Sequence, residues 1–165
     1  MARVYDEKHS ISGINYDICE TQAMLFEYAA KRYNFDNFVE LYMRCDFCRR
    51  AMDTEYSRFQ LETERECMDF ILPEIGEQLV SVETPTISGA VAYWIGFAYR
   101  ALYIRTEIPS KELIEKVPLS AMYGYYPGLH TVEENMQIDI ICEDHKIRQE
   151  KKDILTRQKK LHFII

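Results

Sequence analysis

Apolar residues recur at intervals of three and four along most of the chain, which is the spacing of one buried face of an α-helix. The clearest stripe is made of Phe38, Leu41, Cys45, Cys48 and Met52. Asp36 precedes this stripe and is expected to cap its helix. An earlier helix is expected from Asp17, which is followed by Glu20 in a capping pattern, to about Arg32.

The middle of the chain predicts two further helices joined by a loop. Residues 53–60 are expected to form a connection, after which Thr63 and Glu66 form a capping pattern ahead of an apolar stripe. Pro73 lies within that stripe and is expected to kink or interrupt the helix. Residues 80–87 are predicted to be a loop, with one minor strand or hairpin near 79–87 as the alternative. Ser88 is expected to cap a long apolar helix over residues 89–105.

The last third of the chain predicts short elements. Ser110 is expected to cap a helix that ends before Pro118, and the segment 118–125 to form a turn. Tyr126, Pro127 and Gly128 have the composition of a second turn. Thr131 and Glu134 form a capping pattern that opens a final helix, ending near residue 143.

Together these elements predict an all-α, single-domain bundle of five or six helices with short connections. We expect a flexible N-terminus at residues 1–12, a helical domain at 13–145 and a basic tail, helical or extended, at 146–165. The chain has 165 residues, of which 47% are hydrophobic, and this is enough to bury a substantial core.

The composition excludes several classes of protein. The longest apolar run, residues 89–104, is too short to span a bilayer and contains Arg100. The first residues lack the pattern of a signal peptide, so the expected location is cytoplasmic, with no membrane association. Five cysteines, an odd number without a dense spacing, are expected to be reduced thiols.

Charge is divided unequally along the chain. The whole protein carries a net charge of −7, while residues 146–165 carry seven basic and two acidic side chains, which leaves −12 on residues 1–145. An acidic body with a basic end predicts association with a charged macromolecule.

Motifs for metal binding or catalysis are weak. Cys45 and Cys48 have the C-x-x-C spacing of zinc and redox sites, but no second pair of ligands follows, and both lie on a helical stripe. We therefore expect core cysteines, no bound metal and no cofactor. An enzyme site around Tyr93, Arg100, His130 and Glu134 is an alternative that requires these residues to meet in one pocket.

Aromatic residues are the most informative side chains. Tyrosine, tryptophan and arginine dominate protein-binding surfaces, and the chain contains twelve tyrosines. The residues expected to bind a protein partner are Tyr93, Trp94, Arg100, Tyr103, Tyr123, Tyr125, Tyr126 and His130. The alternative for the segment 93–100 is a core helix with one internally paired arginine.

A nucleic-acid-linked regulator is the second functional hypothesis. It would use basic residues of the second helix and the tail, namely Arg44, Arg49, Arg50, Lys151, Lys152, Lys159 and Lys160. A further variant is an acidic DNA mimic that inhibits a nucleic-acid enzyme.

Three segments together resemble a known group of proteins. They are Phe38-Val-Glu-Leu-Tyr-Met-Arg-Cys through Gln60, Ala92-Tyr-Trp-Ile-Gly-Phe-Ala-Tyr-Arg100 through Ser110, and Tyr126-Pro-Gly-Leu-His-Thr131 through Asp144. They resemble small uncharacterised bacterial proteins found beside ADP-ribosyltransferase-like toxin genes, in toxin–antitoxin neighbourhoods. The resemblance implies an antitoxin or accessory partner that works by binding. Our expectation is thus a non-enzymatic, antitoxin-like or effector-inhibiting module that meets a toxin or effector through acidic helix faces and aromatic anchors; a homodimer is compatible with it.

Overall fold

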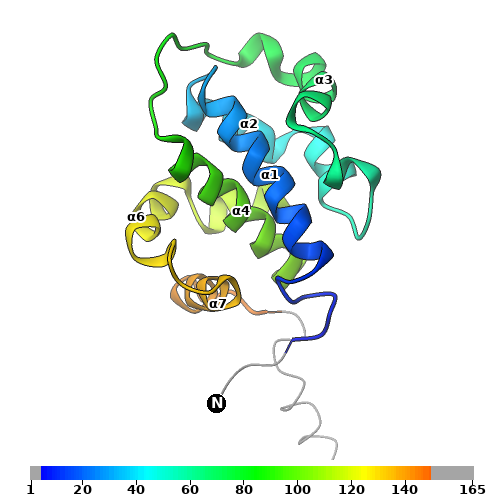
Figure 1. The fold of residues 1–165 in the computed structure, drawn as a ribbon, viewed down its shortest axis with the longest axis vertical. Coiled ribbons are helices and arrows are strands. Elements are labelled where there is room, and N and C mark those ends of the chain that lie inside the picture. The colour runs from blue at the N-terminus through cyan, green and yellow to red at the C-terminus, as the bar shows by residue number, and fades with distance from the viewer. Residues whose placement is uncertain (1–4, 150–165) are drawn as a thin grey trace, which may run out of the picture.

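Two helices, α1 and α4, lie side by side along the middle of the molecule, and the other helices surround them (Figure 1). The structure is a computed structural model that describes residues 5–149, and this part of the chain is all-α, with no strand. Its α-helices are α1 (Ile14–Ala30), α2 (Phe35–Arg44), α3 (Glu64–Ile75), α4 (Gly89–Thr106), α5 (Ser110–Lys116), α6 (Leu119–Leu129) and α7 (Glu134–Asp144). A short π-helix at Cys48–Met52 and 3₁₀ turns at Arg58–Leu61 and Gly76–Gln78 complete the described part.

The close packing of α1 on α4 depends on Gly96. A Cβ atom at this position would lie 2.7 Å from the carbonyl oxygen of Gln22 and 2.8 Å from Cγ of Phe26. The amide of Gln22 uses the same space, because its Nε2 donates to the carbonyl oxygen of Gly96 at 2.9 Å. Glycine is therefore retained in mid-helix at a cost in helix propensity, since any side chain would separate the two helices.

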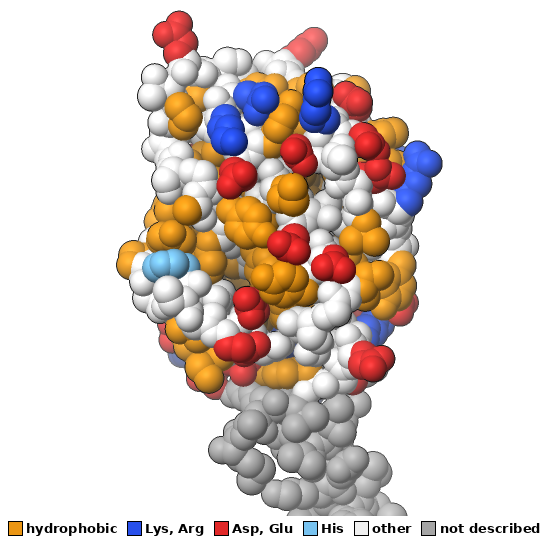
Figure 2. Space-filling model, in the orientation of Figure 1, with side chains coloured by type: hydrophobic (Ala, Val, Ile, Leu, Met, Phe, Trp, Pro, Cys, Tyr) orange, Lys and Arg blue, Asp and Glu red, His pale blue; other side chains and the backbone are white. Residues whose placement is uncertain are grey.

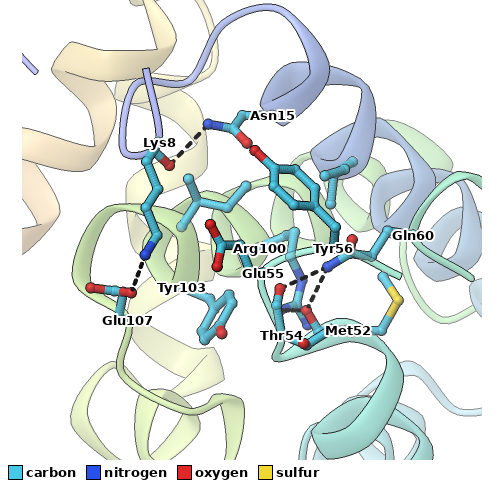
Figure 3. A pocket seen from close by; sticks show the side chains of 12 residues that line it. Lys8, Asn15, Met52, Thr54, Glu55, Tyr56, Gln60, Arg100, Tyr103 and Glu107 are labelled. Atoms are coloured by element: carbon cyan, nitrogen blue, oxygen red, sulfur yellow. Dashed lines mark hydrogen bonds and ion pairs between the residues drawn. The ribbon is translucent and has the colours of Figure 1, made fainter. Parts of the chain in front are cut away.

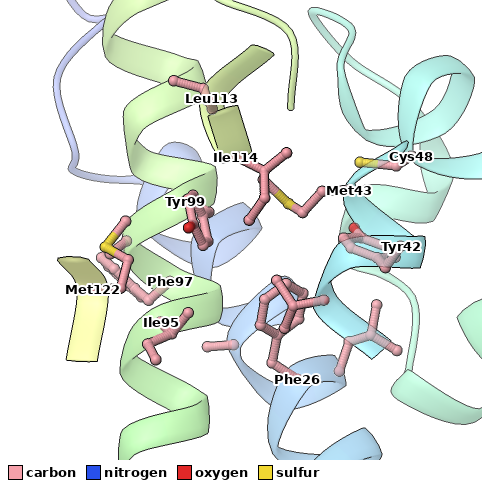
Figure 4. Close-up of a cluster of buried hydrophobic side chains, with 14 of the residues drawn as sticks. Phe26, Tyr42, Met43, Cys48, Ile95, Phe97, Tyr99, Leu113, Ile114 and Met122 are labelled. Atoms are coloured by element: carbon pink, nitrogen blue, oxygen red, sulfur yellow. The ribbon is translucent and has the colours of Figure 1, made fainter. Parts of the chain in front are cut away.

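The core extends from this contact towards α2 and α5. Phe26 meets Tyr42 edge-on, with ring centroids 5.3 Å apart, and Tyr99 donates its hydroxyl to the carbonyl oxygen of Val117. Figure 4 shows Tyr42 of α2 and Tyr99 of α4 pointing into the space between the helices, with Ile114 of α5 between them. Helix α4 is apolar on nearly all sides because it contacts neighbours on nearly all sides. Across the described residues, no helix combines the length and hydropathy needed to cross a bilayer.

Arg100 is fully buried beside this core, at 0% exposure. Its guanidinium pairs with a carboxylate oxygen of Asp53 at 2.7 Å and donates to Oε1 of Gln22 at 2.8 and 3.0 Å. Burial by itself lowers the pKa of Arg100, but the charges of Asp53 and its neighbours outweigh burial and raise the pKa above its ordinary value. Asp53 also accepts from the backbone N–H and the hydroxyl of Ser110. The pair therefore joins α4 to α1 and to the start of α5.

A second buried arginine secures the chain before α1. Arg105 pairs with Asp139 of α7 at 2.7 Å and donates to the carbonyl oxygen of His9 at 3.0 Å. His9 and Ile11 are both buried, so the described part of the segment 1–12 packs against α4 and α7. Of the predicted tail 146–165, only residues 146–149 are described, and Gln149 is buried beside Arg105.

Several predicted helix ends are confirmed and several are wrong. Thr63 and Ser88 accept hydrogen bonds from Glu66 and Val91 and cap α3 and α4 as expected. Four other helices begin after a different residue from the one expected. These residues are Gly13 instead of Asp17 for α1, Asn34 instead of Asp36 for α2, Pro109 instead of Ser110 for α5, and Glu133 instead of Thr131 for α7. The side chains of Asn34 and Glu133 accept the capping hydrogen bonds, whereas Gly13 and Pro109 precede their helices without a side-chain cap, and the local pattern did not distinguish these residues from the expected ones.

Two element assignments also required correction. The helix expected to run through Met52 ends at Arg44, because the carboxylate of Glu74 accepts from the N–H groups of Asp46 and Phe47 and stabilises a break there. The turns expected at 118–125 and at 126–128 were also wrong, because one helix, α6, runs from Leu119 to Leu129, with Pro127 near its exposed C-terminal end. Helix α6 brings the number of α-helices in the described residues to seven rather than five or six. Residues 79–87 form the predicted loop, with a single bridge between Tyr33 and Ser81.

Replacing Gly96 with alanine should weaken the α1–α4 contact strongly. We expect Gly96→Ala to lower the free energy of unfolding by about 3 kcal/mol, because the new methyl group meets backbone and a ring carbon that cannot both move away. Gly124→Ala in α6 is the control, since a Cβ there meets nothing within 4 Å. It should be neutral or stabilising by up to about 1 kcal/mol. Urea unfolding of both variants measures the difference, and equal stabilities would contradict the close-contact explanation.

Removing the charge of Asp53 should leave Arg100 buried without a counter-ion. Asp53→Asn is expected to cost about 3–5 kcal/mol of unfolding free energy. Asp46→Asn provides the matched control, because that carboxylate is 64% exposed and its ion pair is with the exposed Arg49. The control should change stability by less than about 1 kcal/mol. Comparable losses in the two variants, measured by thermal unfolding, would show that burial of the Arg100 pair is not what matters.

Candidate functional site

An aromatic groove lies along the seam between α1 and α4 and extends to α6 and α7. Its volume is about 310 Å³, and its lining includes Tyr16, Tyr93, Trp94, Phe97, Tyr126, His130, Glu27, Glu134 and Gln137. Figure 2 shows hydrophobic side chains gathered over α1, α4 and α6 on this face, with acidic side chains among them. Lys and Arg side chains gather at the upper end and the edges of the same view.

The groove walls are built by ring contacts between different helices. Tyr16 of α1 meets Phe97 of α4 edge-on, with centroids 5.1 Å apart. Trp94 of α4 meets Tyr126 of α6 in the same manner at 6.0 Å, and its Nε1 donates to Oε1 of Gln137 on α7 at 3.0 Å. Each wall is thus fixed by a neighbour from another helix, so the groove is preformed rather than assembled by flexible side chains.

Three glutamate carboxylates lie near these rings. Glu20 accepts a hydrogen bond from the Tyr93 hydroxyl at 2.9 Å, and Glu27 and Glu134 line the groove itself. All three side chains are partly buried, and none forms an ion pair with any residue of the described chain. The groove therefore holds negative charge that the protein does not neutralise internally.

This negative charge acts on the tyrosines. Burial, and then the nearby carboxylates of Glu134 and Glu20, raise the pKa of Tyr16 above its ordinary value. Burial and the hydrogen bond to Glu20 raise the pKa of Tyr93 further. Both phenols consequently remain neutral at physiological pH, and the Tyr93 hydroxyl keeps the hydrogen that it donates to Glu20.

His130 closes one end of the groove. Its ring stacks on Tyr126 with centroids 4.4 Å apart, and its Nδ1 lies 2.7 Å from the carbonyl oxygen of Tyr126. Because a carbonyl only accepts, Nδ1 carries the hydrogen, and Nε2 is left for solvent or a ligand. The ring is exposed, so it offers an adaptable polar contact at the rim.

The structure brings together half of the residues predicted to bind a protein. Tyr93, Trp94, Tyr126 and His130 share the groove, and Glu134 of the alternative enzyme site joins them. Tyr123 donates to Asp36 and lines an adjoining hollow between α6 and the loop before α4, which Tyr126 also borders.

The other predicted residues lie elsewhere. Tyr125 donates to Asp144 and packs on His145, away from the groove lining. Arg100 is buried in its ion pair, with Tyr103 beside it, and so the interpretation of a core helix with one paired arginine is correct for this residue. The alternative enzyme site of Tyr93, Arg100, His130 and Glu134 therefore cannot include Arg100.

The basic residues proposed for nucleic acid are largely paired within the body. Arg44 forms ion pairs with Glu40 and Glu115, and Arg49 pairs with Asp46. Arg50 is exposed. The tail lysines proposed for the same role, Lys151, Lys152, Lys159 and Lys160, lie outside the described residues.

Sequence reasoning missed the contribution of α1 to the site. Tyr16 and Glu27 line the groove, Glu20 accepts the hydrogen bond of Tyr93 beside it, and Phe97 and Gln137 complete its floor. The spacing of Tyr16 and Glu20 by four residues places them on one helix face, but nothing local showed that this face turns towards α4. The resemblance to toxin-associated proteins also begins after α1 and gave no signal there.

A second, smaller cavity lies near the end of α4 (Figure 3). Its volume is about 120 Å³, and Lys8, Glu55, Tyr56, Tyr103 and Glu107 surround it. Lys8 pairs with Glu107 at 3.4 Å, and Gln60 donates to the carbonyl oxygens of Met52 and Thr54. Because its charges and amides largely satisfy one another, this cavity is a poorer candidate than the groove.

Metal and thiol chemistry find little support in the described part of the chain. All five cysteines there are free and buried, and no group of three or more His, Cys, Asp or Glu side chains is arranged to hold a metal ion. Burial raises the pKa of Cys48 to about 11, although Arg100 opposes this effect. Cys45 and Cys48 behave as core residues, and their thiols are too basic to act as nucleophiles at neutral pH.

The groove chemistry suits binding. Its described lining has no serine, threonine, cysteine or lysine, and its hydroxyls belong to tyrosines. What it presents to a ligand is aromatic surface, carboxylate charge and a few fixed hydrogen-bonding groups. This is the composition of a recognition surface with aromatic anchors.

The Tyr93–Glu20 hydrogen bond gives a pH-dependent stability difference. Tyr93→Phe should cost about 1 kcal/mol of unfolding free energy, constant from pH 7 to 9. Folding raises the pKa of Tyr93. The extra stability of the wild-type protein is therefore fully present below the pKa of Tyr93 in the unfolded chain, and it is lost as the pH rises towards and through the pKa in the folded protein. Above pH 10 the advantage should fall at up to about 1.4 kcal/mol per pH unit. Urea unfolding at several pH values tests this, and an advantage that grows with pH would contradict it.

Similarity to known proteins adds no evidence about the groove. No protein-family model, curated protein or solved structure matches this chain. The function is therefore inferred from the side chains that the fold places together on the α1–α4 face.

Proposed function

We propose that this chain is a non-enzymatic protein-binding module that acts as an antitoxin-like inhibitor of a toxin or effector protein. The observation that carries the proposal is the aromatic groove, in which ring faces from three helices border three carboxylates without internal counter-ions. Fixed aromatic anchors supply affinity at a low entropic cost, and unpaired charge selects a partner of opposite sign.

The inhibition in this proposal is steric and electrostatic. The acidic body attracts a basic surface of the partner, and the groove then holds one of its side-chain groups. Binding of this kind blocks a toxin by covering the surface on which it depends. It requires no cofactor and no reaction at the groove.

Charge placement favours this proposal over nucleic-acid binding for the folded body. Arg44 and Arg49, two of the three body arginines invoked for a phosphate backbone, are already paired with acids. The groove face itself is rich in acidic side chains, which repel phosphate (Figure 2).

Co-expression with the product of the neighbouring gene tests the proposal. The wild-type chain should co-purify with that product and suppress its toxicity. Glu134→Arg reverses a charge in the groove and should abolish both effects, whereas Glu112→Arg makes the same change at an exposed position on α5 and should preserve them. Thermal unfolding confirms that both variants remain folded. Recovery of the wild-type chain as a lone monomer, with no effect on toxicity, would overturn the proposal.

A further inference from the structure

The aromatic groove has the features of a receptor for a positively charged planar group. Tyr16, Tyr93 and Tyr126 supply partly exposed rings, and Trp94 and Phe97 form the buried floor beneath them. The face of an aromatic ring is negative and attracts cations, with tryptophan and tyrosine the strongest. A volume of about 310 Å³ accommodates a planar head and its alkyl stem.

The carboxylates around the groove specify the sign of the ligand charge. Glu20, Glu27 and Glu134 have no cationic partner among the described residues. The two acids that lie beside the buried arginines are, by contrast, paired, Asp53 with Arg100 and Asp139 with Arg105. Partly buried carboxylates beside apolar rings cost free energy unless a cation joins them, so the groove is complementary to a cation and repels an anion.

We propose that the groove receives the arginine side chain of a basic segment on the protein partner. The inference rests on the proposed function and names the chemistry by which the partner is recognised. A guanidinium stacks on a tyrosine face through its flat surface while its edge donates to carboxylates, and an ammonium group cannot do both. The protein already uses this geometry internally, since Arg105 lies over the ring of Tyr5 at 3.5 Å and pairs with Asp139. Arg32 also stacks over the ring of Tyr28, at 3.6 Å.

The only tryptophan of the chain provides a direct reporter, because Trp94 forms part of the groove floor. The probe is a short capped peptide with a central arginine between two leucines. The control is the same peptide with citrulline in place of arginine, which keeps the shape of the side chain and removes its charge. The arginine peptide should change Trp94 fluorescence in a saturable manner and bind at least about tenfold more tightly than the citrulline peptide, a ratio that corresponds to about 1.4 kcal/mol.

Two variants locate the effect in the full chain. Glu134→Gln removes one carboxylate charge without changing shape and should weaken the arginine peptide about three- to tenfold, with little change for citrulline. Glu112→Gln, the same change on exposed α5, should leave both affinities unaltered. The preference for arginine should also shrink as salt is raised from low to molar concentration.

Several results would overturn the inference. Equal binding of the two peptides would make the groove a receptor for apolar or amide groups, and no binding of either would exclude an arginine ligand.

A further variant tests whether the basic end of the chain occupies the groove. In this full-length variant, five basic residues are changed to glutamine: Lys151, Lys152, Arg157, Lys159 and Lys160. If only this variant binds the arginine peptide, the occupant is the basic end of the chain itself and not a partner.

The outcome is separable from that of the proposed function. If Glu134→Arg abolishes partner capture but the arginine and citrulline peptides bind alike, protein binding stands and the arginine ligand is excluded. If the arginine peptide binds selectively but the partner is captured equally by every groove variant, the groove recognises arginine and the proposed inhibitory role fails.

Discussion

The structure depends first on how closely α1 approaches α4 at Gly96. The absence of a side chain there lets Gln22 reach the carbonyl oxygen of Gly96, and the other end of the same amide accepts from both Arg100 and Tyr42. One buried glutamine therefore ties α1 to α4, to α2 and to the Arg100–Asp53 ion pair. Because these groups lie in a low-dielectric interior, their hydrogen bonds depend on one another, and separating the two helices would leave several of them unsatisfied.

The aromatic groove is the outer edge of this same contact. Tyr16 and Glu27 of α1 stand opposite Trp94 and Phe97 of α4 only because the two helix axes are held so near. Helices α6 and α7 then close the end of the groove through ring contacts and the bond from Trp94 to Gln137. Because the groove is built on packed helices, its geometry is fixed in advance, and a preformed groove lowers the entropic cost of the binding proposed for it.

The two buried arginines show why charge patterns in the sequence were difficult to interpret. Arg100 lay in the most aromatic segment and was predicted to contact a partner, yet it is completely enclosed and paired with Asp53, which is 47 residues away. The groove carboxylates present the opposite case, since Glu20 was assigned only to a capping pattern and Glu27 gave no local signal, yet both lie beside the groove without an ion pair among the described residues. Whether a charge is neutralised inside the molecule depends on contacts between distant segments, and no local spacing records them.

The sequence alone determined the helical class, the position of the long central helix and the caps at Thr63 and Ser88, because periodicity and capping are properties of neighbouring residues. It also indicated that several tyrosines and Trp94 are candidate binding residues. Tertiary structure decided which face of α1 meets α4, that Arg100 is buried, that residues 126–128 remain helical, and which carboxylates stay unpaired. These outcomes follow from packing between segments far apart in the chain, where burial and partner choice outweigh local propensity.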